Sequence, residues 1–289
     1  SDERLSARMK YRGDYSQLCS YLTTNKRMTD DIYCTLPASE TTLINFLMTY
    51  SMEQVVRFYY VPAFMREIGC MLQPRTVGNQ VVFTNFSEPL LSPSNRLLKR
   101  SFDVVVSLIV LIILLPLLPL IAILIKLQSP GPIFFRQKRT GMDGKDFLMY
   151  KFRSMHPNSL ADTMQATKDD PRKFAFGSFM RKTNIDELPQ FFNVLRGDMS
   201  IVGPRPHMLS HTEEYRHKIV EYMLRHYVRP GITGWAQTTG FRGETAELWQ
   251  MEGRVKRDIW YIQNWTFWLD IRIILKTIWQ KIHKDSNAY

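Results

Sequence analysis

The sequence contains little cysteine, with only Cys19, Cys34 and Cys70 in 289 residues. Because their number is odd and no two of them form a CxxC pair, neither a disulfide framework nor a zinc site is indicated. A reducing, cytoplasmic environment suits this pattern. Residues 1–98 also lack a GxGxxG fingerprint and a Walker loop, so no nucleotide site is inferred in that part of the chain.

Basic residues outnumber acidic residues, and the excess of positive charge is unevenly distributed along the chain. The net charge is +11, yet residues 1–98 hold ten Lys/Arg against nine Asp/Glu, so nearly all of the positive excess lies after residue 98. A basic part of this kind can bind nucleic acid, anionic lipid or a phosphorylated substrate. No DNA- or RNA-binding module is recognisable, so we expect no nucleic-acid partner.

Residues 1–90 are predicted to form part of an α/β domain. Strand composition at residues 31–37 and 56–61 flanks helical spacing at residues 40–55, and residues 80–84 resemble a further strand. This order predicts a partial α/β, Rossmann-like layer. The chain begins at Ser1 without an initiator Met or a signal peptide, so we expect a fragment or a processed form, with the rest of the domain upstream. Pro and Ser at residues 88–95 predict a linker, which we place at residues 91–98.

A membrane element is predicted at residues 99–128. Residues 104–125 carry no charge. This stretch is long enough to span a bilayer, which requires about 20 apolar residues. Pro116 and Pro119 interrupt this stretch, and basic residues flank both of its ends, which the positive-inside rule places in the cytoplasm. We therefore favour a re-entrant hairpin that enters and leaves on one face; a Pro-kinked spanning helix is the alternative.

The most informative stretch is residues 186–206, which opens with the carboxylates Asp186 and Glu187. Apolar residues then follow at helical spacing. Pro189 lacks an N–H and fits only the first helical turn, so Asp186 is expected at or near the helix N-cap. Arg196-Gly197 predicts the end of this helix.

A stiff loop, Gly203-Pro204-Arg205-Pro206, completes this stretch and is expected to fix one guanidinium in space. Carboxylates and an arginine on rigid supports suit phosphoryl chemistry. Taken singly, an Asp-Glu pair is more often a helix cap and Pro-Arg-Pro a surface turn.

Further basic residues precede the acidic pair. Lys151 and Arg153 are expected on one face of a strand and could bind a diphosphate, although a solvated face is the simpler explanation. Arg181 precedes Asp186 by one and a half helical turns or less.

The last part of the chain adds a second loop and an amphipathic helix. Residues 227–237 carry Arg229 and Trp235, which could stack a base or a sugar, or pack as a turn. The histidines of residues 211–226 have no metal-ligand spacing and are interpreted as surface residues. Residues 265–284 place tryptophans opposite lysines, which is typical of a helix lying in a membrane interface.

Together these motifs resemble the bacterial sugar transferases, the monotopic polyprenyl-phosphate phosphoglycosyl transferases of surface-polysaccharide assembly. The resemblance covers residues 99 to about 280 and rests on Lys99-Arg-Ser-Phe-Asp, the Pro-broken apolar segment, Tyr150-Lys-Phe-Arg-Ser-Met, Asp186-Glu187, Arg196-Gly-Asp-Met-Ser-Ile-Val-Gly-Pro-Arg-Pro and Arg229-Pro-Gly-Ile-Thr-Gly-Trp-Ala-Gln. One departure is Leu115-Pro116, where the family often has Ser-Pro.

The resemblance implies an α+β fold. A mainly helical, membrane-associated catalytic domain at residues 129–289 would follow the re-entrant helix and carry interfacial amphipathic helices. Residues 1–98 are similar to the end of the α/β domain in the long, glucose-transferring members, whose N-terminal transmembrane helices would lie upstream of Ser1. The implied location is the bacterial inner membrane, with the active site on the cytoplasmic face and a homodimer as a plausible assembly.

The implied reaction is a ping-pong transfer of sugar 1-phosphate from a UDP-sugar to undecaprenyl phosphate, with release of UMP. Asp186 would be the nucleophile and would bind Mg²⁺, while Arg181 and Arg205 match the family's phosphate-contacting positions. An Asp with an ordinary pKa of about 3.9 is ionised at neutral pH, so we expect Glu187 to hold the metal or orient Asp186 rather than accept a proton. The candidate substrate-binding residues are Lys151, Arg153, Arg181, Arg205 and Arg229.

Two alternatives remain open from the sequence. Glucose is favoured as the sugar by resemblance to the long members, while galactose or an N-acetylhexosamine is not excluded. A non-catalytic scaffold with its basic face on anionic lipid would explain the charge and the membrane helices. It would leave the Asp-Glu pair and the Pro-Arg-Pro loop unexplained.

Overall fold

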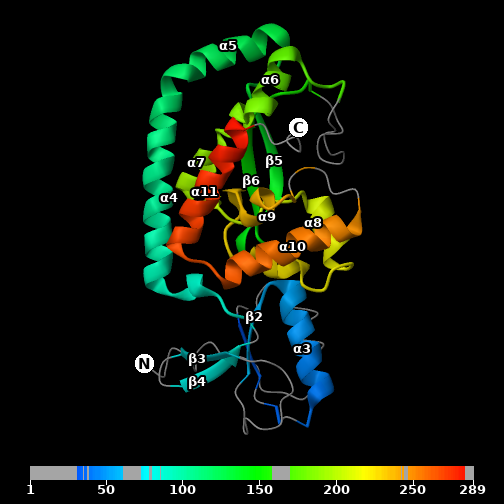
Figure 1. Cartoon of the computed structure of the whole chain (residues 1–289). Coiled ribbons are helices and arrows are strands. Elements are labelled where there is room, and N and C mark those ends of the chain that lie inside the picture. Colours follow the sequence, from blue (N-terminus) through cyan, green and yellow to red (C-terminus); the bar gives the residue numbers. More distant parts are fainter. Residues whose placement is uncertain are drawn as a thin grey trace. The chain divides into compact units, whose positions relative to one another are not determined.

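The computed structural model describes residues 31–34, 36–37, 39–60, 73–77, 80–84, 86–157, 170–241, 243 and 247–283 (Figure 1). The chain divides into two compact units, Ser1–Ser87 and Glu88–Tyr289, each described here by itself. Of the three cysteines, Cys34 is buried and free, whereas Cys19 and Cys70 lie outside the described residues.

The first unit contains a four-stranded sheet in the order β1-β2-β4-β3. The predicted strand–helix–strand order is confirmed, because β1 (Asp31–Cys34) and β2 (Arg57–Tyr60) pair in parallel and α3 (Thr41–Gln54) lies between them in sequence. However, β4 (Gln80–Thr84) pairs antiparallel with both β2 and β3 (Gln73–Val77). Only two residues separate β3 from β4, and a connection this short joins antiparallel strands. The described strands therefore form a mixed sheet, not the parallel sheet expected of a Rossmann-like layer.

A long apolar helical stretch opens the second unit. It consists of α4 (Pro93–Leu114), the 3₁₀ turn η2 (Leu115–Leu117) and α5 (Leu118–Gln128), and its length and composition are sufficient to cross a membrane. Pro116 and Pro119 each lie within the first two residues of a new helical segment, where a missing N–H is tolerated. Figure 1 shows α5 leaving α4 at a marked angle at this point.

The predicted linker at residues 91–98 is largely wrong. The 3₁₀ turn η1 (Pro89–Leu91) ends there, and α4 already begins at Pro93. Proline favours the first position of a helix because its ring presets φ. It has no N–H, but an N–H at this position would have no partner within the helix anyway. The Pro and Ser residues that suggested a linker therefore start a helix.

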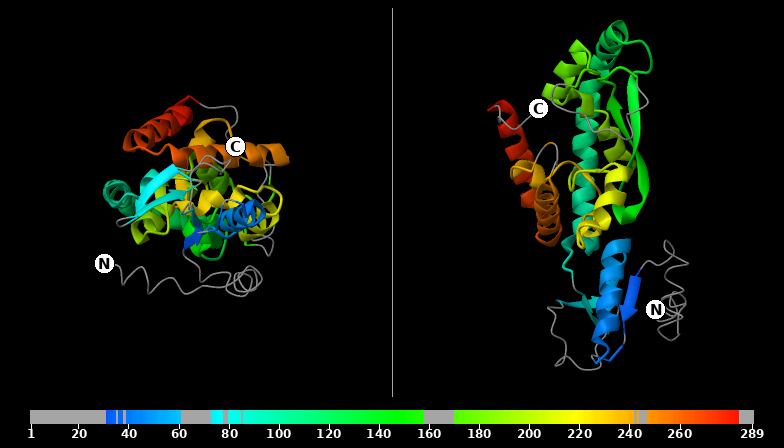
Figure 2. Two further views of the ribbon diagram at one scale, coloured as in Figure 1. Left: turned by 90° about the horizontal axis from the view of Figure 1, so that it is seen from below. Right: turned by 90° about the vertical axis from the view of Figure 1, so that its right-hand side faces the viewer.

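Two short sheets, six further α-helices and three 3₁₀ turns complete the described part of this unit. A hairpin pairs β5 (Phe134–Thr140) with β6 (Asp146–Phe152) through η3 (Met142–Gly144), and β7 (Ser200–Val202) pairs in parallel with β8 (Gly231–Thr233). The remaining helical elements are α6 (Ala175–Thr183), η4 (Ile185–Glu187), α7 (Gln190–Arg196), α8 (Leu209–Arg216), η5 (Tyr222–Tyr227), α9 (Trp235–Thr238), α10 (Leu248–Gln263) and α11 (Phe267–Ile282). The β5–β6 hairpin and the α10–α11 pair lie on opposite faces of the unit (Figure 2).

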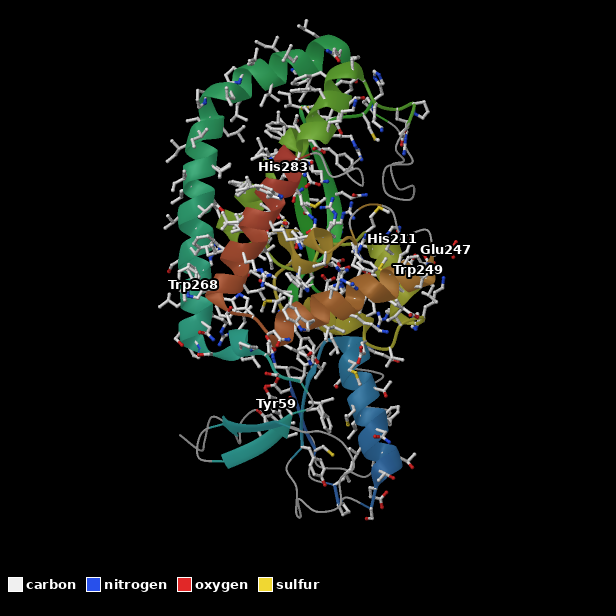
Figure 3. All side chains as sticks on the ribbon, viewed as in Figure 1. Tyr59, His211, Glu247, Trp249, Trp268 and His283 are labelled. Carbon is white, nitrogen blue, oxygen red and sulfur yellow. The ribbon has the colours of Figure 1, made fainter. Side chains whose placement is uncertain are left out.

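The predicted amphipathic helix corresponds to α11. Its exposed apolar side chains include Trp268 and Trp279, which are 76% and 62% exposed. Trp268 lies on α11 near the start of the helix (Figure 3). Thr266 caps the helix by accepting a hydrogen bond from the Leu269 N–H at 3.1 Å. Trp265, expected on the same face, is instead buried and donates its indole N–H to Asp270 at 3.0 Å.

Polar side chains on one face of α4 hold this apolar helix against the rest of the unit. Lys99 Nζ donates to Asp270 Oδ2 at 2.6 Å and to the Val202 carbonyl at 3.0 Å. One turn later, Asp103 Oδ1 accepts from the Ile201 N–H at 3.1 Å. Because these groups are buried, each depends on its partner to replace lost hydration.

We expect Lys99→Met to lower the free energy of unfolding by about 3–5 kcal/mol, because Asp270 would be left as a buried charge without its cation. Thermal unfolding in lipid nanodiscs, followed by tryptophan fluorescence, measures the change. The control is Lys126→Met, the same substitution at an exposed position of α5. Equal stability of the two variants would contradict a structural role for the Lys99–Asp270 pair.

Candidate active site

The two adjacent carboxylates, Asp186 and Glu187, lie in the 3₁₀ turn η4 between α6 and α7. Asn184 ends α6 in the left-handed conformation with φ of 60°, and the turn begins directly after it. The N-cap of α7 is Pro189, so Asp186 precedes the cap and makes no capping hydrogen bond. Asp186 was expected at or near the N-cap; it lies near the cap, three residues before it, in a separate short turn that precedes the helix.

The end of α7 agrees with the sequence prediction. Gly197 adopts a φ of 93° as the C-cap, a conformation that L-residues with a side chain rarely adopt. Arg229 Nε donates to the Gly197 carbonyl at 2.7 Å, and Arg100 Nη2 donates to the Leu195 carbonyl at 2.6 Å. These two arginines satisfy carbonyl groups that a helix end leaves unpaired. Arg229 therefore supports the helix that follows the acidic pair, and the structure gives it no contact with that pair.

Glu187 receives two cations from distant segments. Lys151 Nζ, on β6, lies 2.7 Å from Glu187 Oε1, and Arg205 Nη2, on the loop after β7, lies 2.9 Å from the same oxygen. Both residues were predicted near the acidic pair, and the structure brings both to Glu187.

The pKa values of the two carboxyls are shifted in opposite directions. Burial raises the pKa of Asp186 from 3.8 to about 6, against the lowering effects of Lys151, Arg181 and Arg205. Burial also acts to raise the pKa of Glu187, but Arg205 and Lys151 outweigh it and hold that pKa well below its usual value. The expectation of an ordinary pKa for Asp186 is therefore wrong, because a sequence does not show how deeply a carboxyl is buried. With a pKa of about 6, Asp186 is still mostly ionised at pH 7.

The other predicted basic residues separate into two groups. Arg181, in the last turn of α6, stabilises the ionised form of Asp186. Arg153 is buried and donates instead to the Ser129 hydroxyl at 2.7 Å and to the Pro130 and Pro132 carbonyls at 3.1 and 2.6 Å. It therefore fastens the chain after α5 to the β5–β6 hairpin, and the prediction that it binds substrate has no support in this geometry.

Trp235 was open to two interpretations, and the structure favours the packed turn. Its ring stacks on Trp260, with centroids 4.9 Å apart and an interplanar angle of 27°. Trp235 is the first residue of α9, and Lys276 Nζ lies 5.7 Å from the centroid of its ring. The indole is thus engaged within the protein.

The loop that carries Arg205 is held by hydrogen bonds along its backbone. The Gly203 N–H donates to the Thr233 carbonyl at 2.9 Å, and the Gly231 N–H donates to the Pro204 carbonyl at 2.8 Å. A Cβ at Gly203 would lie 2.4 Å from the Arg229 carbonyl oxygen, so only glycine allows this approach. The predicted stiffness of this loop therefore comes from β8 as well as from its two prolines.

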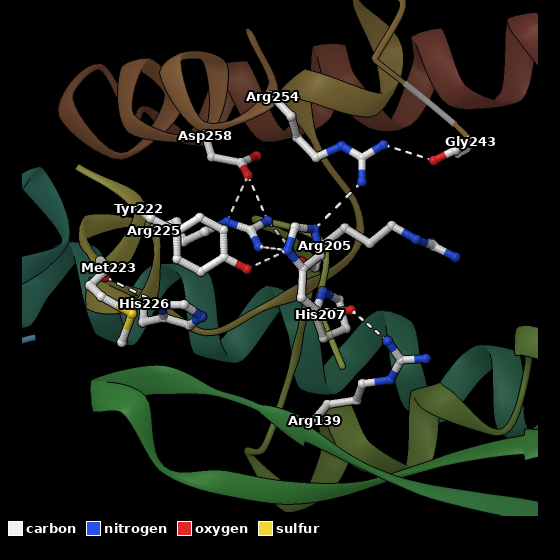
Figure 4. Close-up of polar contacts among 11 residues, drawn as sticks. Arg139, Arg205, His207, Tyr222, Met223, Arg225, His226, Gly243, Arg254 and Asp258 are labelled. Atoms are coloured by element: carbon white, nitrogen blue, oxygen red, sulfur yellow. Dashed lines mark hydrogen bonds and ion pairs between the residues drawn. The ribbon is translucent and has the colours of Figure 1, made fainter. Parts of the chain in front are cut away.

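A buried polar network next to this loop was missed by sequence reasoning (Figure 4). Arg225 Nη2 donates to Asp258 Oδ2 at 2.7 Å and to the Arg205 carbonyl at 2.8 Å, while Arg225 Nη1 lies 2.6 Å from His207 Nδ1. Arg254, on α10, completes the network with a bond to the Gly243 carbonyl at 2.8 Å. No local motif marks these residues, because they meet only through packing of η5 against α10.

The expectation for the three histidines holds only in part. His217 is exposed, as expected. His226 is buried, and burial lowers its pKa to about 3, with Arg225 adding to the effect. His226 lies in η5, all of whose residues are buried. A polar side chain was therefore a poor guide to surface exposure here.

The residues present fit a magnesium ion that is shared with a substrate. Within the described ranges, no group of three or more His, Cys, Asp or Glu side chains is placed to hold a metal by itself. Mg²⁺ usually takes one or two carboxylates and completes its shell with water and substrate phosphates. Asp186 supplies such a carboxylate, whereas Glu187 Oε1 is already bound by two cations.

Comparison with known proteins gives a match to one family and several similar relatives. The sequence model of the bacterial sugar transferase family matches residues 94–284. A UDP-glucose:undecaprenyl-phosphate glucose-1-phosphate transferase of Escherichia coli K12 is 54% identical over 192 residues, covering 66% of this chain and 41% of the relative. One of the same name from Xanthomonas campestris pv. campestris is 43% identical over 269 residues, covering 92% of this chain and 55% of the relative.

A relative named for another sugar is also similar. The UDP-N-acetylgalactosamine-undecaprenyl-phosphate N-acetylgalactosaminephosphotransferase of Aeromonas hydrophila is 45% identical over 221 residues, covering 76% of this chain and 52% of the relative. The chain spans about half the length of the curated relatives that it matches.

We expect Asp186→Asn to stabilise the folded protein at pH 7.5. Between pH 3.8 and about 6 the folded protein keeps a proton that the unfolded chain has lost, so wild-type stability falls as the pH rises through this window. Each pKa unit corresponds to about 1.4 kcal/mol, so the gain from the neutral amide is about 1–3 kcal/mol at pH 7.5 and disappears below pH 4.

Thermal unfolding at pH 4 and pH 7.5 measures this difference, with Asp146→Asn, on an exposed carboxylate, as the control. A gain that is the same at both pH values would show that Asp186 does not carry the raised pKa.

Proposed function

Because the chain belongs to the bacterial sugar transferase family, we propose that it transfers sugar 1-phosphate from a UDP-sugar to undecaprenyl phosphate and releases UMP. The observation that carries the proposal is a buried carboxylate, Asp186, next to a carboxylate whose charge is balanced by Lys151 and Arg205. The names of the similar relatives support this reaction, and glucose is the sugar favoured by those of E. coli and X. campestris.

In the proposed first step, an Asp186 oxygen forms a bond to the sugar-bearing phosphorus. The bond from that phosphorus to the bridging oxygen breaks, and UMP leaves with the electron pair. Arg181 and Arg205 stabilise the charge of the diphosphate, which would otherwise repel the attacking carboxylate. Mg²⁺, when bound by Asp186 and the diphosphate, would neutralise further phosphate charge.

In the second step, an oxygen of undecaprenyl phosphate bonds to the same phosphorus, and the Asp186 oxygen leaves as a carboxylate. The product is a diphosphate-linked lipid sugar. No group has to remove a proton, because both Asp186 and the lipid phosphate are ionised near neutral pH. Glu187, with its low pKa, is a weak proton acceptor, and its role is to hold Lys151 and Arg205 beside Asp186.

We further propose that the stretch from α4 to α5 enters and leaves the membrane on the cytoplasmic face of the inner membrane. The break at Pro116 and Pro119 supports this geometry, as do basic residues at both ends of the apolar stretch. The exposed tryptophans of α11 suit the interface of the same leaflet. This arrangement would bring the lipid acceptor and the soluble donor to one face; a homodimer is an additional proposal from family resemblance.

We expect Mg²⁺-dependent UMP release from UDP-glucose in the presence of undecaprenyl phosphate, and its loss by at least about a thousandfold in Asp186→Asn. A panel of UDP-glucose, UDP-galactose, UDP-N-acetylglucosamine and UDP-N-acetylgalactosamine identifies the sugar. Asp146→Asn serves as the matched control. Absence of UMP release from every donor, by folded protein in nanodiscs, would contradict the proposal and favour the scaffold alternative.

The pH dependence of the first step separates the two carboxylates. Because Asp186 must be ionised, we expect UMP release to fall below about pH 6. The negative charge of Glu187 raises the pKa of Asp186, so Glu187→Gln should move this acid limb to lower pH. A pH series of single-turnover UMP release provides the measurement, with Glu213→Gln as an exposed control. An acid limb that stays in place or moves to higher pH in Glu187→Gln would contradict this prediction.

A further inference from the structure

Arg225 occupies a central position behind the active-site loop, and its side chain is almost completely buried. Its Nε and Nη2 atoms both donate to Asp258 Oδ2, at 3.1 and 2.7 Å. Nη2 also donates to the Arg205 carbonyl at 2.8 Å, and Nη1 reaches His207 Nδ1 at 2.6 Å. One planar guanidinium therefore joins α10 to the Arg205 backbone before Pro206 and to the His207 side chain after it.

Lysine could not make this set of contacts. The guanidinium presents five N–H donors in a rigid plane, and here its donors serve a carboxylate, a carbonyl and an imidazole in different directions. An ammonium group has three donors on a single atom. The network thus specifies arginine at position 225 for geometric reasons in addition to charge.

His207 acts as a neutral acceptor in this network. Its Nδ1 atom lies 2.6 Å from Arg225 Nη1 and 2.7 Å from the Tyr222 hydroxyl, and the arginine can only donate. Nδ1 therefore carries the lone pair and the ring proton is assigned to Nε2, because Arg254 Nη1 lies farther from Nε2, at 3.5 Å, than Arg225 Nη1 lies from Nδ1. Burial, followed by Arg225 and Arg254, holds the pKa of His207 well below its usual value. The imidazole consequently adds no charge, and Asp258 is the carboxylate that balances Arg225.

The Arg205 carbonyl belongs to the residue whose side chain reaches the acidic pair. The Arg205 side chain is 37% exposed, so the packing around its guanidinium constrains it only in part. Its backbone, in contrast, is held by Arg225 on one side and through the Gly231–Pro204 bond on the other. These bonds therefore fix the backbone from which the guanidinium extends; Arg205 and Arg225 are both drawn in Figure 4.

We infer that Arg225 and Asp258 are positioning residues for Arg205: Asp258 orients Arg225, Arg225 fixes the Arg205 carbonyl, and Arg205 is thereby directed to Glu187 and the donor diphosphate. The inference rests on the proposed sugar-phosphate transfer. A change at position 258 acts on the reaction only through Arg205, so its effect depends on the presence of that guanidinium.

The first test is the kinetics of Asp258→Asn and Arg225→Lys in the full chain, with UDP-glucose or whichever donor the wild type uses. We expect kcat/KM for UMP release to fall about 10- to 100-fold, as for a displacement of the order of 1 Å. The acid limb of UMP release should move to higher pH, because Arg205 lowers the pKa of Asp186 and would lie farther away. Arg153→Lys is the matched control: it alters a buried guanidinium that binds carbonyls elsewhere, so it should cost stability and leave the acid limb in place.

The decisive test is a double-mutant cycle with Arg205→Ala. Adding Asp258→Asn to Arg205→Ala should lower activity by less than threefold further, although its effect on thermal stability persists. Equal losses of activity in both backgrounds, or an unmoved acid limb, would overturn the inference and leave a purely structural role. If Asp258→Asn does not fold, Arg225→Lys, which keeps the charge, enters the same cycle. Absence of UMP release by the wild type would instead refute the proposed function.

Discussion

The hydrogen bonding of one backbone segment, residues 201–205, determines most of the arrangement around the acidic pair. Asp103 binds the N–H at its start, Lys99 binds the Val202 carbonyl, and Arg225 binds the Arg205 carbonyl at its end. These three side chains come from the apolar helix α4 and from η5. Since buried backbone groups must be paired, this segment has little freedom, and the arginine that it carries inherits that rigidity.

The same bonds connect the apolar helix α4 to the segment that carries Arg205. Lys99 binds Asp270 on α11 as well as Val202, so a single buried cation contacts the apolar helix, the amphipathic helix and the loop strand. Tyr261, on α10, shares Asp270 and the Val202 carbonyl, at 2.7 and 3.1 Å. In the proposed reaction a lipid acceptor and a water-soluble donor meet at one carboxylate, and this network fixes the positions of the elements that would face them.

The two adjacent carboxylates illustrate how environment separates chemically similar groups. Lys151 and Arg205 reach Glu187, and their proximity keeps it ionised. Asp186 is buried without such a close pair, and its higher pKa leaves it at greater electrostatic energy. In the proposed reaction, a carboxylate in this state gains from forming a bond to phosphorus, whereas Glu187 is stabilised where it is. The proposed division of roles between nucleophile and support rests on this difference.

The sequence alone determined those features of the protein that depend on residues close together along the chain. The apolar stretch, the breaks at Pro116 and Pro119, the acidic pair, and the end of α7 at Gly197 were all predicted from local patterns. Tertiary structure decided the rest. Lys151 and Glu187 meet across 36 residues and Arg225 and Asp258 across 33, so no local spacing could pair them. Arg153 and Arg229 match motifs yet bind carbonyls, and Asp186 acquires its raised pKa from desolvation, which exists only once other segments pack around it.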